Sequence, residues 1–301
     1  MKRLWAQICF FFASNLNLKG FFTGKIYQGA LKNICVPGLN CYSCPGALGS
    51  CPIGSLQAVL GSAKYNISLY AAGFLALFGT FLGRFICGWL CPFGLVQDLM
   101  YKIKTKKIKA VKKIDLPLRY LKYAVLIVTA ILLPIFAVND FGIGEPFFCQ
   151  YLCPSGTLFG GIPLLLANPS LRKAAGLLFS WKMAVLLSLL TLSVLLYRPF
   201  CKYLCPLGAV YALFNKISVY QIKVDKSKCT NCKTCEHICK MQVPVSSSPK
   251  HAECIRCGEC KKACKTGALT AGFGIDLKKN KKESPCSRCE SSKGSADLSL
   301  W

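Results

Sequence analysis

The sequence predicts a mainly α-helical protein, a polytopic membrane bundle of about four spans followed by a small C-terminal α+β domain. Of its 301 residues, 53% are hydrophobic, and the mean hydropathy is +0.42. A soluble protein of this length does not need so much apolar surface. Several apolar runs also approach the ~20 residues that a helix needs to cross a bilayer. After the last of these runs, cysteines become dense and regularly spaced.

Four apolar segments are the predicted spans. The first follows Lys2 and Arg3, and we interpret it as an uncleaved span because no small-x-small cleavage site follows it. A further apolar segment, 157–167, is too short to cross and is predicted to be re-entrant or interfacial. The spans lie near residues 4–18, 66–86, 118–138 and 176–197 of a membrane domain that covers residues 1–220.

The distribution of positive charge predicts how these spans are oriented. The formal net charge is +26, and much of it lies in loops beside apolar segments, such as the lysine-rich run 102–113. Such loops face the cytoplasm. Counting spans from this loop places 20–65 and 139–175 outside and the C-terminal domain inside. We therefore expect a multi-pass cell-membrane protein, and the charge does not require a nucleic-acid partner.

Two cysteine runs in the C-terminal region have the same spacing, Cys-x2-Cys-x2-Cys-x3-Cys. Three cysteines at two-residue gaps can hold one corner of an iron–sulfur cube, and the fourth then reaches a second cube. Zinc is the alternative, although its two cysteine pairs are usually further apart. The predicted sets are Cys229, Cys232, Cys235 and Cys264 for the first cluster, and Cys254, Cys257, Cys260 and Cys239 for the second.

Residues 221–272, which contain both runs, resemble a two-cluster bacterial ferredoxin domain. The resemblance implies two [4Fe–4S] clusters here. The remaining segment, 273–301, is polar, and we expect it to be disordered. It carries Cys286 and Cys289, a half-site that is either a loose metal site or, as we favour, two idle thiols.

An internal repeat carries further cysteines within the membrane domain. The phrase Cys-x3-Cys-Pro-x-Gly occurs three times, and a partial copy, Cys-Pro-x-Gly, precedes them. The proline suits the start of a new helix, whose N-terminal N–H groups favour a negatively charged cofactor. Buried structural cysteines are the plainer interpretation, but three copies with the same flanking residues argue against it. The copies contain Cys87 and Cys91, Cys149 and Cys153, and Cys201 and Cys205, with Cys51 in the partial copy.

The predicted topology decides which copies can share a cluster. The pairs Cys87/Cys91 and Cys201/Cys205 both follow the cytoplasmic ends of spans, so they can form one inner-face cluster of four cysteines. Arg84 and Arg198, three residues before each pair, are predicted to hydrogen-bond this cluster or to offset its charge. On the other face, four of six cysteines could hold an outer cluster, with Cys149 and Cys153 and two of Cys41, Cys44 and Cys51 preferred. The six candidates are Cys35, Cys41, Cys44, Cys51, Cys149 and Cys153.

The repeated motif followed by a two-cluster ferredoxin domain is similar to the membrane-bound polyferredoxin family, over residues ~84–270. Relatives accompany periplasmic nitrate reductase and nitrous-oxide reductase maturation. Members with two copies of the motif match the pairs beginning at Cys87 and Cys201. The resemblance implies two to four [4Fe–4S] clusters and the transfer of electrons between a cytoplasmic donor or acceptor and a membrane or extracytoplasmic partner.

Two other functions remain open from the sequence. Cys41 and Cys44 form a Cys-x2-Cys that could take part in a membrane thiol–disulfide relay, and a cluster-binding redox sensor or assembly factor is the other alternative. The sequence contains no defensible nucleophile–base pair, phosphate loop or flavin attachment site. Its two histidines, His237 and His251, lie outside the apolar segments. We therefore expect an electron-transfer subunit of an oxidoreductase system, with redox partner proteins on both membrane faces supplying any flavin.

Overall fold

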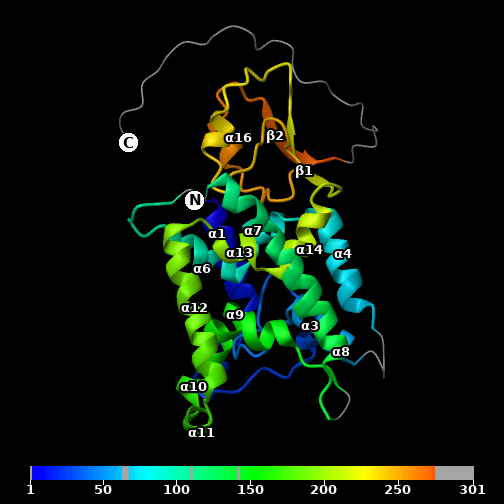
Figure 1. The fold of residues 1–301 in the computed structure, drawn as a ribbon, viewed down its shortest axis with the longest axis vertical. Coiled ribbons are helices and arrows are strands. Elements are labelled where there is room, and N and C mark those ends of the chain that lie inside the picture. Colours follow the sequence, from blue (N-terminus) through cyan, green and yellow to red (C-terminus); the bar gives the residue numbers. More distant parts are fainter. Residues whose placement is uncertain (1, 63–67, 109–110, 141–142, 275–301) are drawn as a thin grey trace.

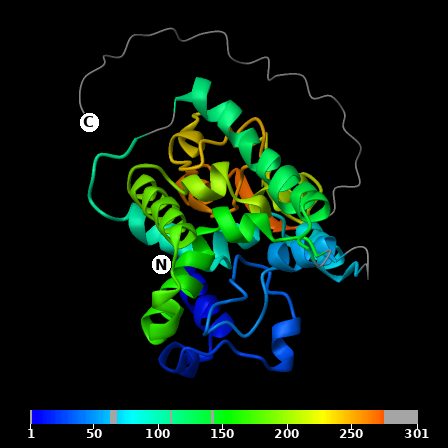
Figure 2. The same ribbon diagram turned by 60° about the horizontal axis from the view of Figure 1, so that its bottom comes forward.

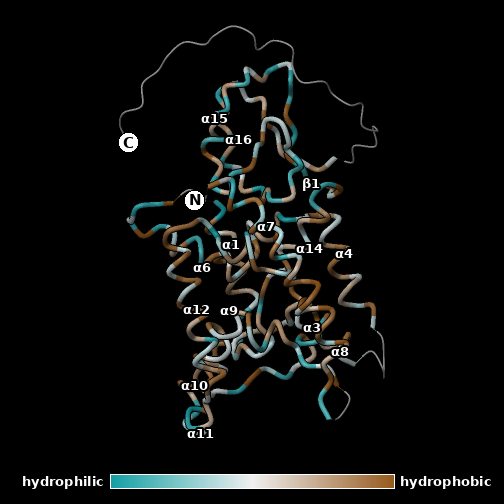
Figure 3. The backbone as a smooth tube through the Cα atoms, in the orientation of Figure 1, coloured by the Kyte–Doolittle hydropathy of each residue, from teal (hydrophilic) through white to brown (hydrophobic). Residues whose placement is uncertain are grey.

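The computed structural model describes residues 2–62, 68–108, 111–140 and 143–274. A bundle of helices forms the body, and a small domain with two strands lies at one end of it (Figure 1). Figure 3 shows hydrophobic residues along the helices of the body and a more hydrophilic C-terminal domain. Cys286, Cys289 and most of the predicted polar tail lie outside the described residues.

The longer helices build the body. The helix that starts at Lys112 runs through a π-helical stretch to Phe136, and it is one of two described helices long and apolar enough to cross a membrane. The second is α12. The main elements are α1 (Lys2–Ser14), α3 (Pro52–Gly61), α4 (Tyr70–Leu82), α6 (Pro92–Tyr101), α7 (Lys112–Val125), η2 (Leu126–Leu132), α8 (Leu133–Phe136), α12 (Leu177–Leu195) and α14 (Pro206–Phe214).

Two of the four predicted spans thus have helices of spanning length. The helices at the other two, α1 and α4, have 13 residues each, which is fewer than a span needs. Helix α4 ends early because Gly83 has a positive φ of 51°, a conformation that breaks the helix before Arg84. The predicted span 118–138 began too late. Its helix, α7, starts six residues earlier, at Lys112, and has a polar first turn.

Short helices connect these elements. Figure 2 shows the N-terminal segments after α1 (blue) gathered at the end of the bundle, away from the C-terminal domain of Figure 1. The segment predicted to be re-entrant, 157–167, is helical and short. The short elements are α2 (Leu18–Thr23), η1 (Ala30–Asn33), α5 (Phe85–Trp89), η3 (Phe148–Leu152), α9 (Pro154–Gly156), η4 (Thr157–Gly161), α10 (Ile162–Ala167), α11 (Pro169–Lys173) and α13 (Pro199–Tyr203).

Each repeated motif folds as a helix break. A short helix carries the first cysteine, and the second cysteine is the N-cap of the next helix, with proline at its first position. Proline is favoured there because its missing N–H would have no partner in the helix. At Cys91 and Cys205 the N-cap sulfur accepts a hydrogen bond from the N–H of the motif glycine, at 3.4 and 3.3 Å. The motif therefore places both cysteines beside a helix N-terminus.

The C-terminal domain is closed by two antiparallel strands, β1 (Tyr220–Val224) and β2 (Leu269–Phe273), paired from Tyr220 with Phe273 to Val224 with Leu269. Between them, two short helices, α15 (Thr234–His237) and α16 (Glu259–Ala263), pack together. The domain docks on the polar start of α7, where Arg119 donates hydrogen bonds to the carbonyls of Met241 and Gln242.

Replacing Gly88 by alanine is expected to disturb this docking. A Cβ at Gly88 would lie 2.3 Å from the carbonyl oxygen of Ile255, so the backbones of α5 and the C-terminal domain would have to separate. We expect greater protease sensitivity of the domain. Gly73→Ala in α4 is the control, because a Cβ there meets nothing within 4 Å. Equal protease sensitivity of the Gly88 and Gly73 variants would show that the contact between Gly88 and Ile255 is not tight.

Candidate metal centres

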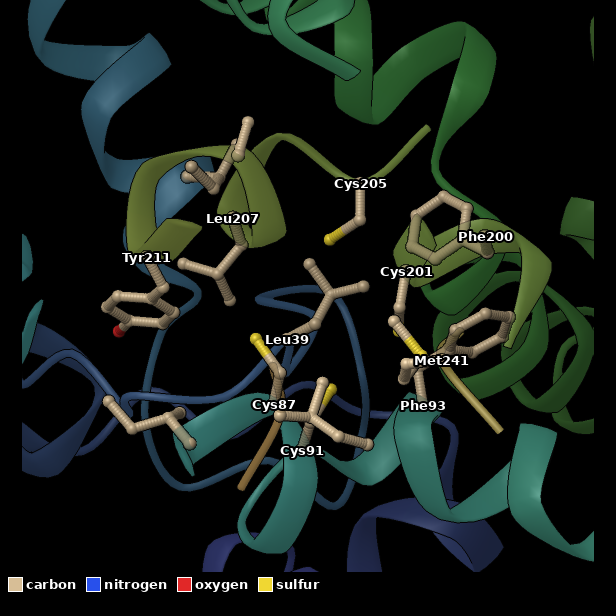
Figure 4. Close-up of a cluster of buried hydrophobic side chains, with 14 of the residues drawn as sticks. Leu39, Cys87, Cys91, Phe93, Phe200, Cys201, Cys205, Leu207, Tyr211 and Met241 are labelled. Carbon is tan, nitrogen blue, oxygen red and sulfur yellow. The ribbon is translucent and has the colours of Figure 1, made fainter. Parts of the chain in front are cut away.

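The structure brings the four predicted inner-face cysteines together. Cys87 and Cys91 come from α5 and α6, and Cys201 and Cys205 from α13 and α14, and all four are buried. Figure 4 shows the two pairs approaching one region from opposite sides, beside Leu39. Burial, followed by the neighbouring Cys201 and Cys87 thiols, raises the pKa of Cys91 to about 12. Thiols so placed resist ionisation unless a cationic group lies among them.

Each motif arginine crosses to the opposite copy of the motif. The Arg84 guanidinium donates to the carbonyl of Cys201 at 2.9 Å, and the Arg198 guanidinium donates to the carbonyl of Cys87 at 2.5 Å. Both side chains are fully buried. The backbone carbonyls of two predicted ligands, Cys201 and Cys87, therefore accept hydrogen bonds from the arginine of the opposite copy of the motif. This reciprocal arrangement stabilises the pairing of the two copies, and it places two positive charges beside the thiols.

Buried acids neutralise these arginines. Arg198 makes two hydrogen bonds to Asp98, at 2.8 and 2.6 Å, and Arg84 contacts Glu253 of the C-terminal domain at 2.5 Å. Despite burial, which opposes the charge, the nearby arginines lower the pKa of both carboxyls to about 2. Sequence reasoning singled out neither Asp98 nor Glu253. The position of Glu253 immediately before Cys254 was the one available signal.

On the other side of the body, the structure groups four of the six outer candidates. Burial, followed by the Cys149, Cys41 and Cys51 thiols, raises the pKa of Cys153 well above its usual value. A Cβ at the motif glycine Gly156 would lie 3.6 Å from the sulfur of Cys41 and 4.0 Å from that of Cys153. The geometry therefore favours the set Cys41, Cys51, Cys149 and Cys153.

The other two candidates have different neighbours. The Cys44 sulfur lies 3.5 Å from the side-chain oxygen of Asn15, and the Cys35 sulfur lies 3.6 and 3.5 Å from the hydroxyls of Ser50 and Ser55. Both thiols are buried. Oxygen neighbours of this kind suit a protonated thiol that donates a weak hydrogen bond.

In the C-terminal domain, the two predicted cysteine sets line two separate cavities. The fourth cysteine of each run lines the cavity of the other run, as the ferredoxin spacing predicted. The first cavity contains Cys229, Cys232, Cys235 and Cys264, and the second contains Cys239, Cys254, Cys257 and Cys260. The second cavity is also lined by Met241 and Ile255, which pack against the body.

The donor chemistry of all four sets fits [4Fe–4S] clusters. Each set offers four thiols, the ligands that hold such clusters. Among the residues that the structure covers, no three cysteine, histidine or acidic side chains converge tightly enough for a single metal ion. Cluster ligands need not converge on one point, because they attach to separate corners of a cube. In the inner set, the Arg84 Nε is buried without a protein partner, so the site retains a donor that can face an anionic cluster.

The sites follow one another through direct contacts. Gly88, beside Cys87, touches the backbone of Ile255, beside Cys254. On the other side of the inner set, Gly38 packs against Cys91, where a Cβ would lie 3.2 Å from the Cys91 Cα. Loop residue Leu39 accepts a hydrogen bond from Ser155, at 3.4 Å, in the turn after Cys153. These contacts join the second C-terminal set, the inner set and the outer set in a continuous series.

Together, the helical body, its two helices of membrane-spanning length and its four cysteine sets, of which the inner one is wholly buried, define an iron–sulfur protein. A family model described as a 4Fe-4S binding domain matches residues 65–110, 123–167 and 177–225. Each matched segment contains one copy of the Cys-x3-Cys-Pro motif. The chain therefore binds [4Fe–4S] clusters.

The chain belongs to the polyferredoxin family of ferredoxin-type electron-transport proteins. It is 35% identical to an uncharacterised protein of Methanocaldococcus jannaschii, over 64% of this chain and 74% of that protein. It is 31% identical to the methylamine utilization ferredoxin-type protein MauN of Methylobacillus flagellatus, over 71% and 69% of the two chains. The ferredoxin-type protein NapH of Haemophilus influenzae is 28% identical, over 66% of each. No solved structure matches.

Proposed function

We propose that this protein passes electrons across a membrane through four [4Fe–4S] clusters, between a cytoplasmic donor or acceptor and a partner on the other face. The observation that carries the proposal is the contact between successive cysteine sets, from the C-terminal domain through Gly88 and Ile255 to the inner set, and through the loop at Gly38 to the outer set. Bound clusters supply one-electron carriers. The protein positions them, excludes water and balances their charge.

The distribution of charge supports the proposed orientation. The C-terminal domain, the start of α7 and the N-terminus lie at one end of the body (Figure 1). Arg3 holds that N-terminus through a contact with Asp98 at 2.6 Å. Lys107 and Ile108, in the lysine-rich segment before α7, contact the C-terminal end of α12 at this end of the body. The positive-inside rule favours the cytoplasm for such an end. The outer set lies beyond the inner one, towards the opposite face.

The iron content of anaerobically purified protein tests the number of clusters. Four cubes require about sixteen irons and an equal amount of acid-labile sulfide per chain. A value of about eight would confine the clusters to the C-terminal domain. The membrane cysteines would then be thiols, and the thiol–disulfide relay would be the better proposal.

A pair of neighbouring variants tests the outer set. We expect Cys41→Ser to remove about four irons per chain, because Cys41 lies among Cys51, Cys149 and Cys153. Cys44→Ser, three residues away, is the matched control and should retain all the iron, because the Cys44 sulfur faces Asn15. Iron analysis and EPR of the reduced proteins distinguish the two. The reverse result would place Cys44 in the cluster instead of Cys41.

A further inference from the structure

Two glutamines occupy the same position in two copies of the motif. Gln97 lies six residues after Cys91 in α6, and Gln57 lies six residues after Cys51 in α3. Both sequences read Cys-Pro-x-Gly-x-x-Gln. Both helices begin at the motif proline, so each glutamine is placed about one and a half turns into its helix. Both side chains are fully buried.

Each glutamine donates to a cysteine of the opposite copy. The Gln97 amide nitrogen lies 3.1 Å from the Cys201 sulfur, and the Gln57 amide nitrogen lies 3.3 Å from the Cys149 sulfur. Cys201 and Cys149 are the first cysteines of their own copies. The same contact, between the same motif positions, therefore occurs once in the inner set and once in the outer set.

The amide orientations are consistent with a negatively charged acceptor. The Gln57 oxygen accepts a hydrogen bond from the N–H of Phe148 at 3.1 Å, which fixes its nitrogen towards Cys149. The Gln97 oxygen is buried without a protein partner. If the Gln97 amide were turned over, its oxygen would face the Cys201 sulfur. A cluster-bound thiolate would repel that oxygen, because both atoms carry negative charge and neither donates a hydrogen bond. A thiolate therefore holds the orientation in which nitrogen faces sulfur.

We propose that Gln97 and Gln57 are matched positioning residues that raise the reduction potentials of the inner and outer membrane clusters. A hydrogen bond to a ligand sulfur stabilises negative charge on the cluster. The reduced cluster carries one more electron than the oxidised cluster, so the bond stabilises the reduced form more. The two glutamines keep the two membrane centres at related potentials. This inference rests on the proposed function, because it requires clusters at both sites.

The experiment is an anaerobic redox titration monitored by EPR, on the full-length protein in detergent. Gln97→Leu removes the donor and keeps the bulk, and it should lower the midpoint potential of one cluster, the one that Cys201→Ser abolishes. Gln57→Leu should lower the potential of a different cluster, the one that Cys149→Ser abolishes. Gln221→Leu is the control, because the amide of this buried glutamine donates to the Ser218 carbonyl. Unchanged potentials in both test variants, or equal shifts in all clusters, would overturn the inference.

A second variant covers the case in which leucine prevents cluster assembly. Gln97→Met keeps the length of the side chain, adds no charge and removes the N–H donor, so the cluster should assemble with a lowered potential. Loss of iron in both Gln97 variants would overturn the tuning role and assign the residue to assembly. The proposed function fails differently, through wild-type protein that holds about eight irons instead of about sixteen. A wild-type value near sixteen with unshifted variants would reject the glutamine inference alone.

Discussion

Replacing Cys201 by serine should remove the inner cluster and interrupt electron transfer through the protein. Cys201 lies among Cys87, Cys91 and Cys205, and no other described cysteine is grouped with this set. We expect iron to fall by about four per chain, while the EPR signals of the C-terminal domain remain. Electron transfer between the two faces should fall to background, because the contacts at Gly88 and Gly38 place the inner set between the C-terminal domain and the loop that leads to the outer set.

The matched control for this variant is Cys9→Ser. Cys9 is exposed on α1 and belongs to none of the four sets. It should retain the wild-type iron content and transfer rate. If Cys201→Ser also retained both, the inner set would not hold a cluster, and the series from the C-terminal domain to the outer set would be broken.

Replacing Glu253 by glutamine should loosen the C-terminal domain from the body. The Glu253 carboxylate binds both Arg84 and Lys122, whose side chains are fully buried. Neutralising it leaves two buried positive charges without their partner. Removing one member of a buried ion pair typically costs about 3–5 kcal/mol. Glu253 also lies next to Cys254, so the same change weakens the junction between the inner and second C-terminal sites.

Unfolding by urea and limited proteolysis measure this effect. The domain should be cleaved at lower protease concentration, and electrons should pass from it to the body more slowly. Asp225→Asn is the control, because its ion pair with Lys228 is exposed, with a separation of 3.9 Å; exposed pairs contribute only about 0–1 kcal/mol. Equal stability of Glu253→Gln and the wild type would show that Glu253 does not hold the domain in place.

The cysteine patterns were the most informative part of the sequence. The spacing of the C-terminal runs predicted that Cys239 and Cys264 each belong to the site of the other run. In the structure, each of these cysteines lines the other run's cavity. The predicted topology placed the copies at Cys87 and Cys201 on one face, and the structure brings them together. The spacings are informative because cluster ligation fixes short spacings along the chain. The choice between Cys41 and Cys44 could not be made in this way, since it depends on how a loop folds against Asn15.

Contacts between residues far apart in the chain could not be predicted from the sequence. The motif predicted that Arg84 and Arg198 serve the inner set, but each arginine contacts the opposite copy and takes its acid from elsewhere in the chain. Helix lengths were overestimated at α4 because hydropathy does not register a backbone break such as that at Gly83. The glutamines at positions 57 and 97 could have been found by aligning the motif copies beyond their glycine.

Electron transfer across a sealed membrane tests the central claim most directly. The protein would be reconstituted into vesicles that contain a trapped electron acceptor, and a membrane-impermeant reductant would be added outside. We expect the trapped acceptor to be reduced by the wild-type protein and by Cys9→Ser, and not by Cys201→Ser. Clusters that become reduced without ever reducing the trapped acceptor would contradict the account, and a redox sensor or assembly factor would then explain the protein better.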